Sequence, residues 1–381
     1  MLVVFDQSKT GSLVVNRVND FAIVGAGVIG MMLARELAQA GATVALIDKG
    51  ECARESSWAG GGIVSPLYPW RYSTPVTQLA TWSQSSYLHL SQDLLEETGL
   101  DPELRQRGMY MVDVDDEEDA LQWAQQHHRP MMRVDAQHLY NREPNFAPGH
   151  TSALWMPEVS SIRNPRLGAA LKQSVVLDPN ITVHEHSEVA GLLSDGQRVL
   201  GVKTSRAEIK AAHTIVTSGA WTGELLKRFD VSLPVEPVKG QMMVFNAPVG
   251  LVNRVVLMGG RYVIPRNDGR ILVGSTLEYE GFDKQTTDVA FTSLRDTAIG
   301  IIPELANYDV EHHWAGLRPG SPEGIPFIGE VPAWQGLSVN AGHFRNGLVL
   351  APASTRLHAD LLLGRDPVID PQPYQLAGRM S

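Results

Sequence analysis

The chain has 381 residues, of which 43% are hydrophobic and 19% charged, and its formal net charge is −10 with a mean hydropathy of −0.10. These values predict a soluble globular protein of one large or two interleaved domains, and the acidic balance argues against a nucleic-acid partner. No apolar stretch has the length of a membrane span, and the N-terminus lacks a signal-peptide pattern. The single cysteine, Cys52, excludes an internal disulfide and favours a cytoplasmic protein.

The first recognisable unit follows residues 1–19, which we interpret as an N-terminal extension with no assigned role. The run "FAIV" predicts a buried strand, "MMLARELAQA" a helix closed by Gly41, and "ATVALID" a second strand. This order predicts a βαβ unit.

Three glycines in "GAGVIG" form a G-x-G-x-x-G pattern between that strand and that helix. Gly25 permits the tight turn, Gly27 lets backbone N–H groups approach a pyrophosphate, and Gly30 lets the helix and strand pack closely. Asp48, 18 residues beyond Gly30, ends the second strand and can accept hydrogen bonds from a ribose. The pattern predicts a dinucleotide site but does not separate NAD from FAD, and a bare glycine turn is the alternative.

A second glycine run, "ESSWAGGGIVSP", comes directly after the second strand. Glycines at 60–62 leave room for a planar ring against the backbone, and Ser56 and Ser57 can donate hydrogen bonds to phosphate or ring atoms. A nicotinamide enzyme has no need of this second run, so the segment favours a flavin. A flexible surface loop is the alternative interpretation.

The remainder of the chain predicts a helical, charged region around residues 92–126 and then several strands. "HTIVTSGA", "GQMMVFNA" and "RYVIPRNDGRILVGST" are strand patterns, and "NDG" predicts a hairpin turn. "GLSVNAGHFRNGLVLAP" predicts a last strand, a glycine loop and a helix. Buried strands therefore recur near the start, middle and end, and we expect one domain assembled from separated segments with another inserted.

One arginine, Arg318, stands in "WAGLRPGSPEG", a run that is otherwise apolar, glycine or proline apart from one serine and one glutamate. Exposed turns usually carry several polar side chains, so a lone cation in this setting suggests a bound anion. A guanidinium matches a carboxylate with a planar fork, which indicates an acid group as the ligand. A structural ion pair is the alternative.

Together, "DFAIVGAGVIG", "ESSWAGGGI", "PVKGQMM", "WAGLRPGSPEGIPFIG" and "GHFRNG" resemble the D-amino-acid-oxidase-like flavoproteins, from about Asp20 to the late 360s. The resemblance implies an α/β fold with a Rossmann-like FAD-binding domain built from discontinuous segments, plus a β-sheet-rich α+β substrate domain. The FAD-binding domain would comprise residues 20–85, 150–222 and 316–370, and the substrate domain residues 86–149 and 223–315. FAD would be bound non-covalently.

The resemblance also implies site residues. Substrate contacts fall on Tyr262, Arg318 and Arg345, although Tyr262 could instead pack within a strand and Arg345 could brace loop carbonyls. Cofactor contacts fall on Gly25, Gly27, Val28, Ile29, Gly30, Asp48, Lys49, Ser56, Ser57, Gly61, Gly62, Ile63, Val189, Gly219, His343, Phe344, Arg345, Asn346, Gly347, Leu348 and Val349.

The glycine-oxidising members of the family match most closely. They imply oxidation of glycine and small amines such as sarcosine, D-proline and small D-amino acids to the imine, then to the 2-oxo acid and ammonia. Dioxygen would be reduced to hydrogen peroxide, in the service of thiamine biosynthesis, by a homo-oligomer that is a tetramer. The alternatives are a D-amino-acid dehydrogenase that passes electrons to quinone and a flavin-binding module without turnover.

The sequence offers little support for a metal site. His184 and His186 alternate along one predicted strand, but no third ligand stands at a standard spacing. We therefore expect no metal, and we interpret Cys52 as an ordinary small residue rather than as a flavin tether.

Overall fold

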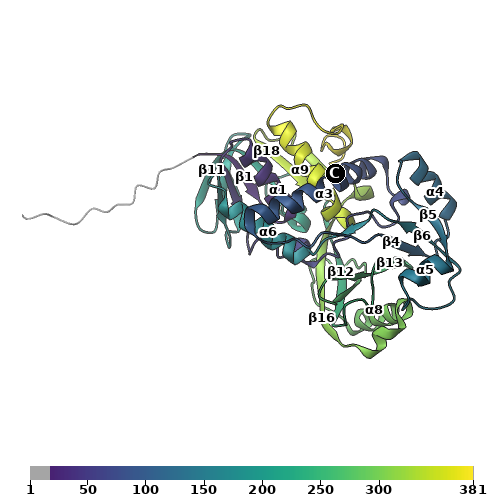
Figure 1. Cartoon of the computed structure of the whole chain (residues 1–381). Coiled ribbons are helices and arrows are strands. Elements are labelled where there is room, and N and C mark those ends of the chain that lie inside the picture. The colour runs from purple at the N-terminus through teal and green to yellow at the C-terminus, as the bar shows by residue number, and fades with distance from the viewer. Residues whose placement is uncertain (1–17, 381) are drawn as a thin grey trace, which may run out of the picture.

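The computed structural model describes residues 18–380, which form two lobes, each built on an eight-stranded sheet (Figure 1). The N-terminal extension expected over residues 1–19 lies, except for its last two residues, outside this described range. No helix in the described range is long and apolar enough to cross a membrane.

The first sheet is mainly parallel, with the strand order β17-β18-β11-β1-β2-β8 and with β10 and β9 extending from β11. Its strands are β1 (Asn19–Val24), β2 (Val44–Ile47), β8 (Ile181–His184), β9 (Val189–Asp195), β10 (Arg198–Thr204), β11 (Glu208–Val216), β17 (Phe327–Glu330) and β18 (Leu337–Ala341). Four helices gather against it and against one another: α1 (Val28–Gln39), α3 (Thr74–Thr98), α6 (Asn164–Leu177) and α9 (Gly347–Leu362).

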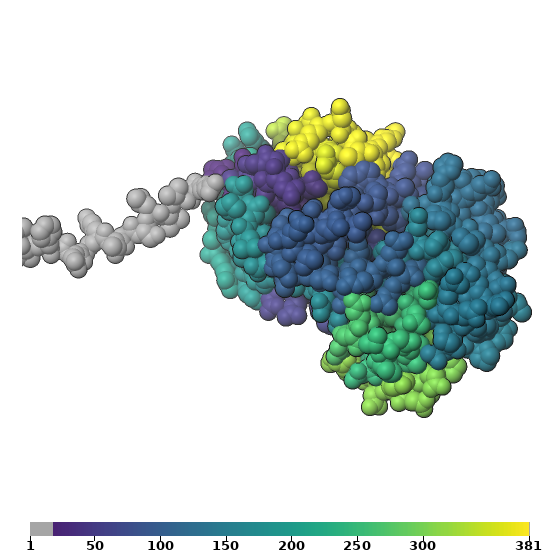
Figure 2. Space-filling view, viewed as in Figure 1, coloured from purple at the N-terminus to yellow at the C-terminus, as the bar shows by residue number. Residues whose placement is uncertain are grey.

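Both faces of this sheet are covered, which explains the unbroken apolar run of β1. Phe21 and Ile23 point into the core shared with α1 and α9, whereas Ala22 and Val24 point into a second core. That second core includes residues of α7 (Thr222–Lys227). The C-terminal segment lies beside the first strand and helix, so the two ends of the described chain complete one lobe (Figure 2).

The second sheet is mainly antiparallel, with the order β16-β12-β15-β14-β13-β4-β6-β5. Its strands are β4 (Met109–Val112), β5 (Met132–Asp135), β6 (Ser152–Met156), β12 (Glu236–Phe245), β13 (Val255–Met258), β14 (Arg261–Pro265), β15 (Ile271–Gly274) and β16 (Val310–Gly320). The helices of this lobe are α4 (Glu117–Gln126), α5 (Ala136–Arg142) and α8 (Asp288–Ile301). A small two-stranded sheet pairs β3 (Arg105–Gln106) with β7 (Ser160–Ser161).

Several local expectations are confirmed. Helix α1 is followed by Gly41 at φ +88°, the left-handed conformation that closes a helix. The "NDG" turn joins β14 to β15, where Arg266 N donates to Arg270 O at 2.8 Å and Gly269 has φ +90°.

The structure differs from the expected segments at three points. Strand β6 pairs with β4 and β5 in the second sheet, although residues 150–222 were assigned to the first domain. Helix α3 crosses the expected boundary at residues 85/86 because its length packs on α9 and α6. The region 92–126 is not uniformly helical, since β4 separates α3 from α4.

A buried carboxylate, Glu143, lies at the end of α5 with only 1% of its surface exposed. Its Oε2 accepts from Asn253 N at 3.0 Å, while Oε1 has no hydrogen-bond partner among the described residues and lies 3.5 Å from Arg254 Nη1. Burial raises the pKa of Glu143 from 4.5 to about 7, against the opposing effect of Asn253 and Arg254. The folded protein therefore holds a proton here that the unfolded chain has lost.

We expect the free energy of unfolding to fall by about 3 kcal/mol as the pH rises from about 4.5 to about 7, because in this window the folded state binds more protons. Glu143→Gln removes the titration and should flatten this slope. Urea unfolding at pH 5, 6, 7 and 8 measures it. Glu96→Gln is the matched control, because Glu96 is exposed, and this variant should keep the wild-type slope. A wild-type slope in Glu143→Gln would contradict the prediction.

Candidate active site

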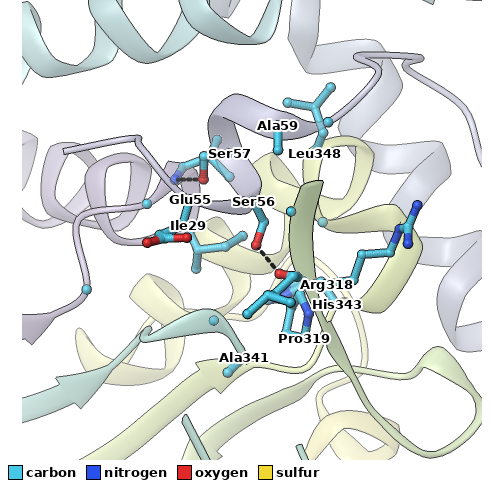
Figure 3. A pocket seen from close by; sticks show the side chains of 18 of the residues that line it. Ile29, Glu55, Ser56, Ser57, Ala59, Arg318, Pro319, Ala341, His343 and Leu348 are labelled. Atoms are coloured by element: carbon cyan, nitrogen blue, oxygen red, sulfur yellow. Dashed lines mark hydrogen bonds between the residues drawn. The ribbon is translucent and has the colours of Figure 1, made fainter. Parts of the chain in front are cut away.

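A deep cleft between the two sheets holds about 1960 Å³ of empty space, counting its open mouth. Its walls come from the β1–α1 loop, the end of β2, the segment around α2 (Ser56–Ala59), β16 and the β18–α9 loop. Figure 3 shows Ile29 and Glu55 on one side of it and Arg318, Pro319 and His343 on the other. The carboxyl ends of the parallel strands thus open into the cleft, as in other α/β sheets that bind ligands.

The glycines of the β1–α1 loop bring helix α1 into direct contact with the turn. Gly25 has φ +117°, and a Cβ added to Gly30 would lie 1.8 Å from Gly25 O and 2.8 Å from Thr217 Oγ1. Thr217 Oγ1 also donates to Gly25 O at 2.7 Å. The start of α1 consequently faces the cleft with the positive end of its dipole, which suits a phosphate.

Asp48 ties the end of β2 to this loop. Its Oδ2 accepts from Ala26 N at 2.7 Å and its Oδ1 from Gly50 N at 2.8 Å. Burial raises the pKa of Asp48, and these two hydrogen bonds oppose the shift. The neighbouring Lys49 Nζ lies 3.6 Å from the centre of the Trp221 ring, and burial lowers the pKa of Lys49. The carboxylate keeps lone pairs that face the cleft and can accept from hydroxyl groups.

The segment with the second glycine run forms the middle of the cleft. Ser57 Oγ accepts from Val28 N at 2.9 Å, and Ser56 Oγ donates to Leu317 O at 2.5 Å (Figure 3). Asn164 donates to Ser57 O at 3.0 Å, but its Oδ1 is buried and has no partner among the described residues. An acceptor of this kind in the cleft wall calls for a ligand that donates a hydrogen bond or for an ordered water.

The β18–α9 loop is fixed from behind by buried side chains. His343 Nε2 lies 2.8 Å from Ser354 Oγ, which donates to Asn340 Oδ1 at 2.7 Å. Burial lowers the pKa of His343 to about 3, so the imidazole stays neutral. In the same loop, Asn346 Nδ2 is buried without a described acceptor and lines the cleft. Together with Asn164 Oδ1, this offers a ligand one buried donor and one buried acceptor.

Arg318, on β16, is a half-buried cation without a countercharge. Its Nη1 donates to Lys239 O and Thr276 O, both at 3.2 Å, and its Nη2 donates to Ser275 Oγ at 2.7 Å. No carboxylate of residues 18–380 forms an ion pair with it, so the structure does not favour the structural ion-pair alternative. Burial, the largest cause, lowers the pKa of Arg318, and the guanidinium stays charged because its intrinsic pKa is so high.

Tyr262, on β14, is 7% exposed, and its ring lies between two glycines. A Cβ on Gly61 would lie 3.0 Å from Tyr262 Oη, and a Cβ on Gly274 would lie 2.8 Å from it. Among the described residues, its hydroxyl has a hydrogen-bond partner only in the Met242 sulfur, at 3.9 Å, so it remains able to donate to a ligand.

Arg345 is exposed at the mouth of the cleft. No described residue pairs with it, and it does not brace loop carbonyls. Its charge is one of the causes that lower the pKa of Arg318, which shows that the two cations are close enough to interact. Two neighbouring cations in this part of the cleft favour an anionic ligand.

The structure brings nearly all the predicted site residues to this one cleft. Gly30 alone does not line it, because it lies behind the loop in contact with Gly25 O. The cleft-lining residues from the prediction are Gly25, Gly27, Val28, Ile29, Asp48, Lys49, Ser56, Ser57, Gly61, Gly62, Ile63, Val189, Gly219, Tyr262, Arg318, His343, Phe344, Arg345, Asn346, Gly347, Leu348 and Val349.

Sequence reasoning missed Asn164, Ser275 and the paired glycines of β12 and β16. Gly240 faces Gly316 across the two strands, and a Cβ at Gly240 would lie 2.1 Å from Arg318 Nη1. A glycine inside an apolar strand indicates that another group approaches the backbone closely. The stretches "VKGQMM" and "WAGL" could therefore have predicted this packing from the sequence. Nothing in the sequence singled out Asn164 or Ser275.

Gly240→Ala tests this packing. We expect the added methyl to displace the guanidinium and to raise the apparent KM for a carboxylate substrate about tenfold, with FAD still bound. Steady-state kinetics and flavin absorbance measure the two effects. Gly300→Ala is the matched control, since a Cβ there meets no atom within 4 Å, and an unchanged KM in Gly240→Ala would contradict the packing argument.

The described residues contain no group of three or more His, Cys, Asp and Glu side chains that could hold a metal ion. His184 lies on β8, and burial lowers its pKa. Cys52 is buried, and burial raises the pKa of its thiol to about 12, which leaves it a poor nucleophile.

The fold and the cleft define an α/β protein of the dinucleotide-binding type, with the cation of Arg318 in its second sheet. A family model described as FAD-dependent oxidoreductase, abbreviated DAO, matches residues 20–361. The chain belongs to this family of FAD-dependent enzymes, as the sequence resemblance indicated. The cleft fits the cofactor, because its glycines leave the backbone accessible to a ligand. In addition, Asn164 Oδ1 and Asn346 Nδ2 are buried and have no hydrogen-bond partner among the described residues.

Several relatives carry the same activity name. The chain is 56% identical to the glycine oxidase of Pseudomonas aeruginosa and 50% identical to that of Pseudomonas putida, and each match covers 94% of this chain and 98% of the relative. The crystal structure of glycine oxidase from Geobacillus kaustophilus superposes with a TM-score of 0.89 at 30% identity, over 95% of this chain and 99% of that one. These matches confirm the predicted fold class.

Proposed function

We propose that the protein oxidises glycine and small amines such as sarcosine, D-proline and small D-amino acids. Glycine, dioxygen and water would give glyoxylate, ammonia and hydrogen peroxide. The observation that carries the proposal is Arg318, a half-buried guanidinium that pairs with no described carboxylate and lines the cleft of an FAD-dependent oxidoreductase. The names of the relatives at 56% and 50% identity support glycine as the substrate.

Arg318 would hold the substrate carboxylate, and Tyr262 would donate a hydrogen bond to the same group. FAD supplies the two-electron oxidation when bound. The glycines at 61, 240 and 274 let these two side chains lie directly against the backbone, since a Cβ at any of them would lie within 3.0 Å of Tyr262 or Arg318. Holding the reacting atoms at about 3–3.5 Å accounts for much of the rate in such a site.

No general base lies beside these two side chains within residues 18–380. His343 lines the cleft, but its Nε2 is engaged by Ser354 and burial keeps the imidazole neutral. The substrate amine therefore has to arrive neutral, so that its lone pair assists as the α C–H bond breaks. The residues of the cleft act by orientation and electrostatics.

We further propose that the first lobe binds FAD and the second supplies the substrate contacts. The cofactor would lie from the adenine end, near Val189, along the β1–α1 loop to the β18–α9 loop. Asp48, Asn164 and Asn346 would hold its polar groups. Family resemblance supports a homotetramer that serves thiamine biosynthesis. The single buried cysteine, Cys52, supports a cytoplasmic protein. Light scattering of the purified protein tests the tetramer.

A substrate panel with the purified yellow protein tests the function. Peroxide formed under air with glycine, sarcosine, D-proline and D-alanine supports an oxidase. Dye reduction without peroxide would instead support the quinone-linked dehydrogenase. An unchanged flavin spectrum after anaerobic addition of every amino acid would support a module without turnover.

Tyr262→Phe should cost about 1 kcal/mol in kcat/KM, a loss of about fivefold, because it removes one hydrogen bond to the carboxylate. The ring stays packed between its glycines, so stability should hold. Steady-state kinetics with glycine measure the change. A loss as large as that of an arginine deletion would mean that the hydroxyl has another role.

A further inference from the structure

Three hydrogen bonds orient the Arg318 guanidinium, and all come from two segments of the second sheet. Lys239 O lies on β12, whereas Ser275 Oγ and Thr276 O belong to the 275–287 connection between β15 and α8. A guanidinium has five N–H donors, so these three bonds leave two unused. No described residue accepts from Nε, and Nη2 makes only the one bond. The two remaining donors belong to Nε and Nη2, which are neighbouring nitrogens of the guanidinium.

We propose that Ser275 is a positioning residue which turns the free edge of the Arg318 fork toward the substrate carboxylate, and that Gln241 holds Ser275 and Thr276 in place for this task. The inference rests on the proposed function, because it concerns how that carboxylate is received. Arg318 would touch the substrate, while Ser275 and Gln241 would act through it.

Hydrogen bonds, rather than side-chain packing, decide this orientation. Gly240 faces the guanidinium and offers no side chain to confine it, since its missing Cβ would lie 2.1–2.4 Å from the guanidinium atoms. A long arginine side chain without anchors retains considerable rotamer freedom. The Ser275 hydroxyl, at 2.7 Å, makes the shortest of the three bonds and is the only side-chain anchor among them.

Gln241 joins the 275–287 connection to β12. Its N donates to Thr276 Oγ1 at 2.8 Å, and Thr276 N donates to Gln241 O at 3.2 Å. The side chain is fully buried: Nε2 donates to both Glu278 oxygens at 3.0 and 3.1 Å, and Oε1 accepts from Thr287 N at 3.0 Å. Both ends of the connection are therefore fixed by one residue of β12.

The same network engages Glu278, a carboxylate whose charge acts on Arg318. Glu278 accepts from Gln241 and from Thr276 Oγ1, and the buried ammonium of Lys239 lies 3.7 Å from it and 3.1 Å from Asp283. Lys239 is 1% exposed, so its charge requires these partners. Because Glu278 is engaged in this way, the Arg318 cation stays available for a carboxylate from outside the chain.

The test uses the FAD-loaded protein and glycolate, which has the carboxylate of glycine but a hydroxyl in place of its amine. The Kd comes from the change in flavin absorbance on titration. We expect Ser275→Ala to weaken glycolate binding about tenfold and to raise the KM for glycine by a similar factor, with a smaller change in kcat. Ser275→Cys keeps the size but accepts poorly, so it should behave like Ser275→Ala, while Ser275→Thr keeps the hydroxyl and should restore binding.

Gln241→Met tests whether Gln241 holds Ser275 and Thr276 in place, because methionine keeps the length of the side chain without its hydrogen bonds. We expect this variant to bind glycolate several-fold more weakly. Wild-type glycolate affinity in Ser275→Ala and Ser275→Cys, alongside a loss in Arg318→Ala, would overturn the inference and leave the proposed function standing. Unchanged affinity in Arg318→Ala as well would overturn the carboxylate site itself. Unchanged affinity in Gln241→Met alone would overturn the role of Gln241.

Discussion

Replacing Arg318 with alanine raises the apparent KM for glycine by about 100-fold or more, because a desolvated charge pair broken on one side costs about 3–5 kcal/mol. The guanidinium has no other countercharge in residues 18–380, so its full attraction is available to the substrate. Arg318→Lys keeps the charge but loses the planar fork, and its KM should lie between those of the wild type and Arg318→Ala.

Arg345→Ala is the comparison variant, because it removes a cation from the same cleft at an exposed position. Its effect should be only a few-fold and should shrink as salt is added, since exposed charges are screened. FAD affinity, followed by flavin fluorescence, should match the wild type in the two Arg318 variants. A KM increase below threefold in Arg318→Ala would remove this arginine from the carboxylate site.

Local patterns predicted the parts of the fold that depend on neighbours in sequence. The βαβ unit, the left-handed Gly41 and the "NDG" hairpin each follow from a few adjacent residues. The sheet to which β6 belongs could not be read in this way, because its partners β4 and β5 are set by tertiary pairing. Helix α3 crossed an expected boundary for the same reason, since α9, from the far end of the chain, covers it.

The candidate site divides along the same line. The dinucleotide glycines and the lone Arg318 stand out in the sequence because their residue types are unusual for their settings. Ser275 is an ordinary serine after a strand, and its bond to Arg318 arises because β12 lies between β15 and β16. Asn164 begins α6 and donates to Ser57 O. The two residues are 107 positions apart in the sequence, so no local pattern predicts this contact. Spatial partners of a recognised residue are thus the part that required the structure.

The Rossmann loop makes the second large prediction: Gly30→Ala should weaken FAD binding by at least 100-fold. A Cβ at this position would lie 1.8 Å from the Gly25 carbonyl oxygen, where backbone atoms cannot yield cheaply. Helix α1 would have to shift away from the turn, which moves the N–H groups of its first turn out of line with the pyrophosphate. Flavin fluorescence titration of the apoprotein measures the loss.

Gly50→Ala is the matched control for this change. It lies just beyond Asp48 at the other end of the βαβ unit, and a Cβ there would meet only Asp48 Oδ1, at 3.8 Å. We expect that variant to bind FAD as the wild type does. Gly30→Ala could lose FAD because the start of α1 is displaced or because the protein no longer folds, and circular dichroism separates these two causes. A native spectrum with no bound flavin supports displacement of the helix start alone. Wild-type affinity in Gly30→Ala would show that the phosphates are held elsewhere in the cleft, because the contact with Gly25 leaves no room for a methyl group while the loop keeps its shape.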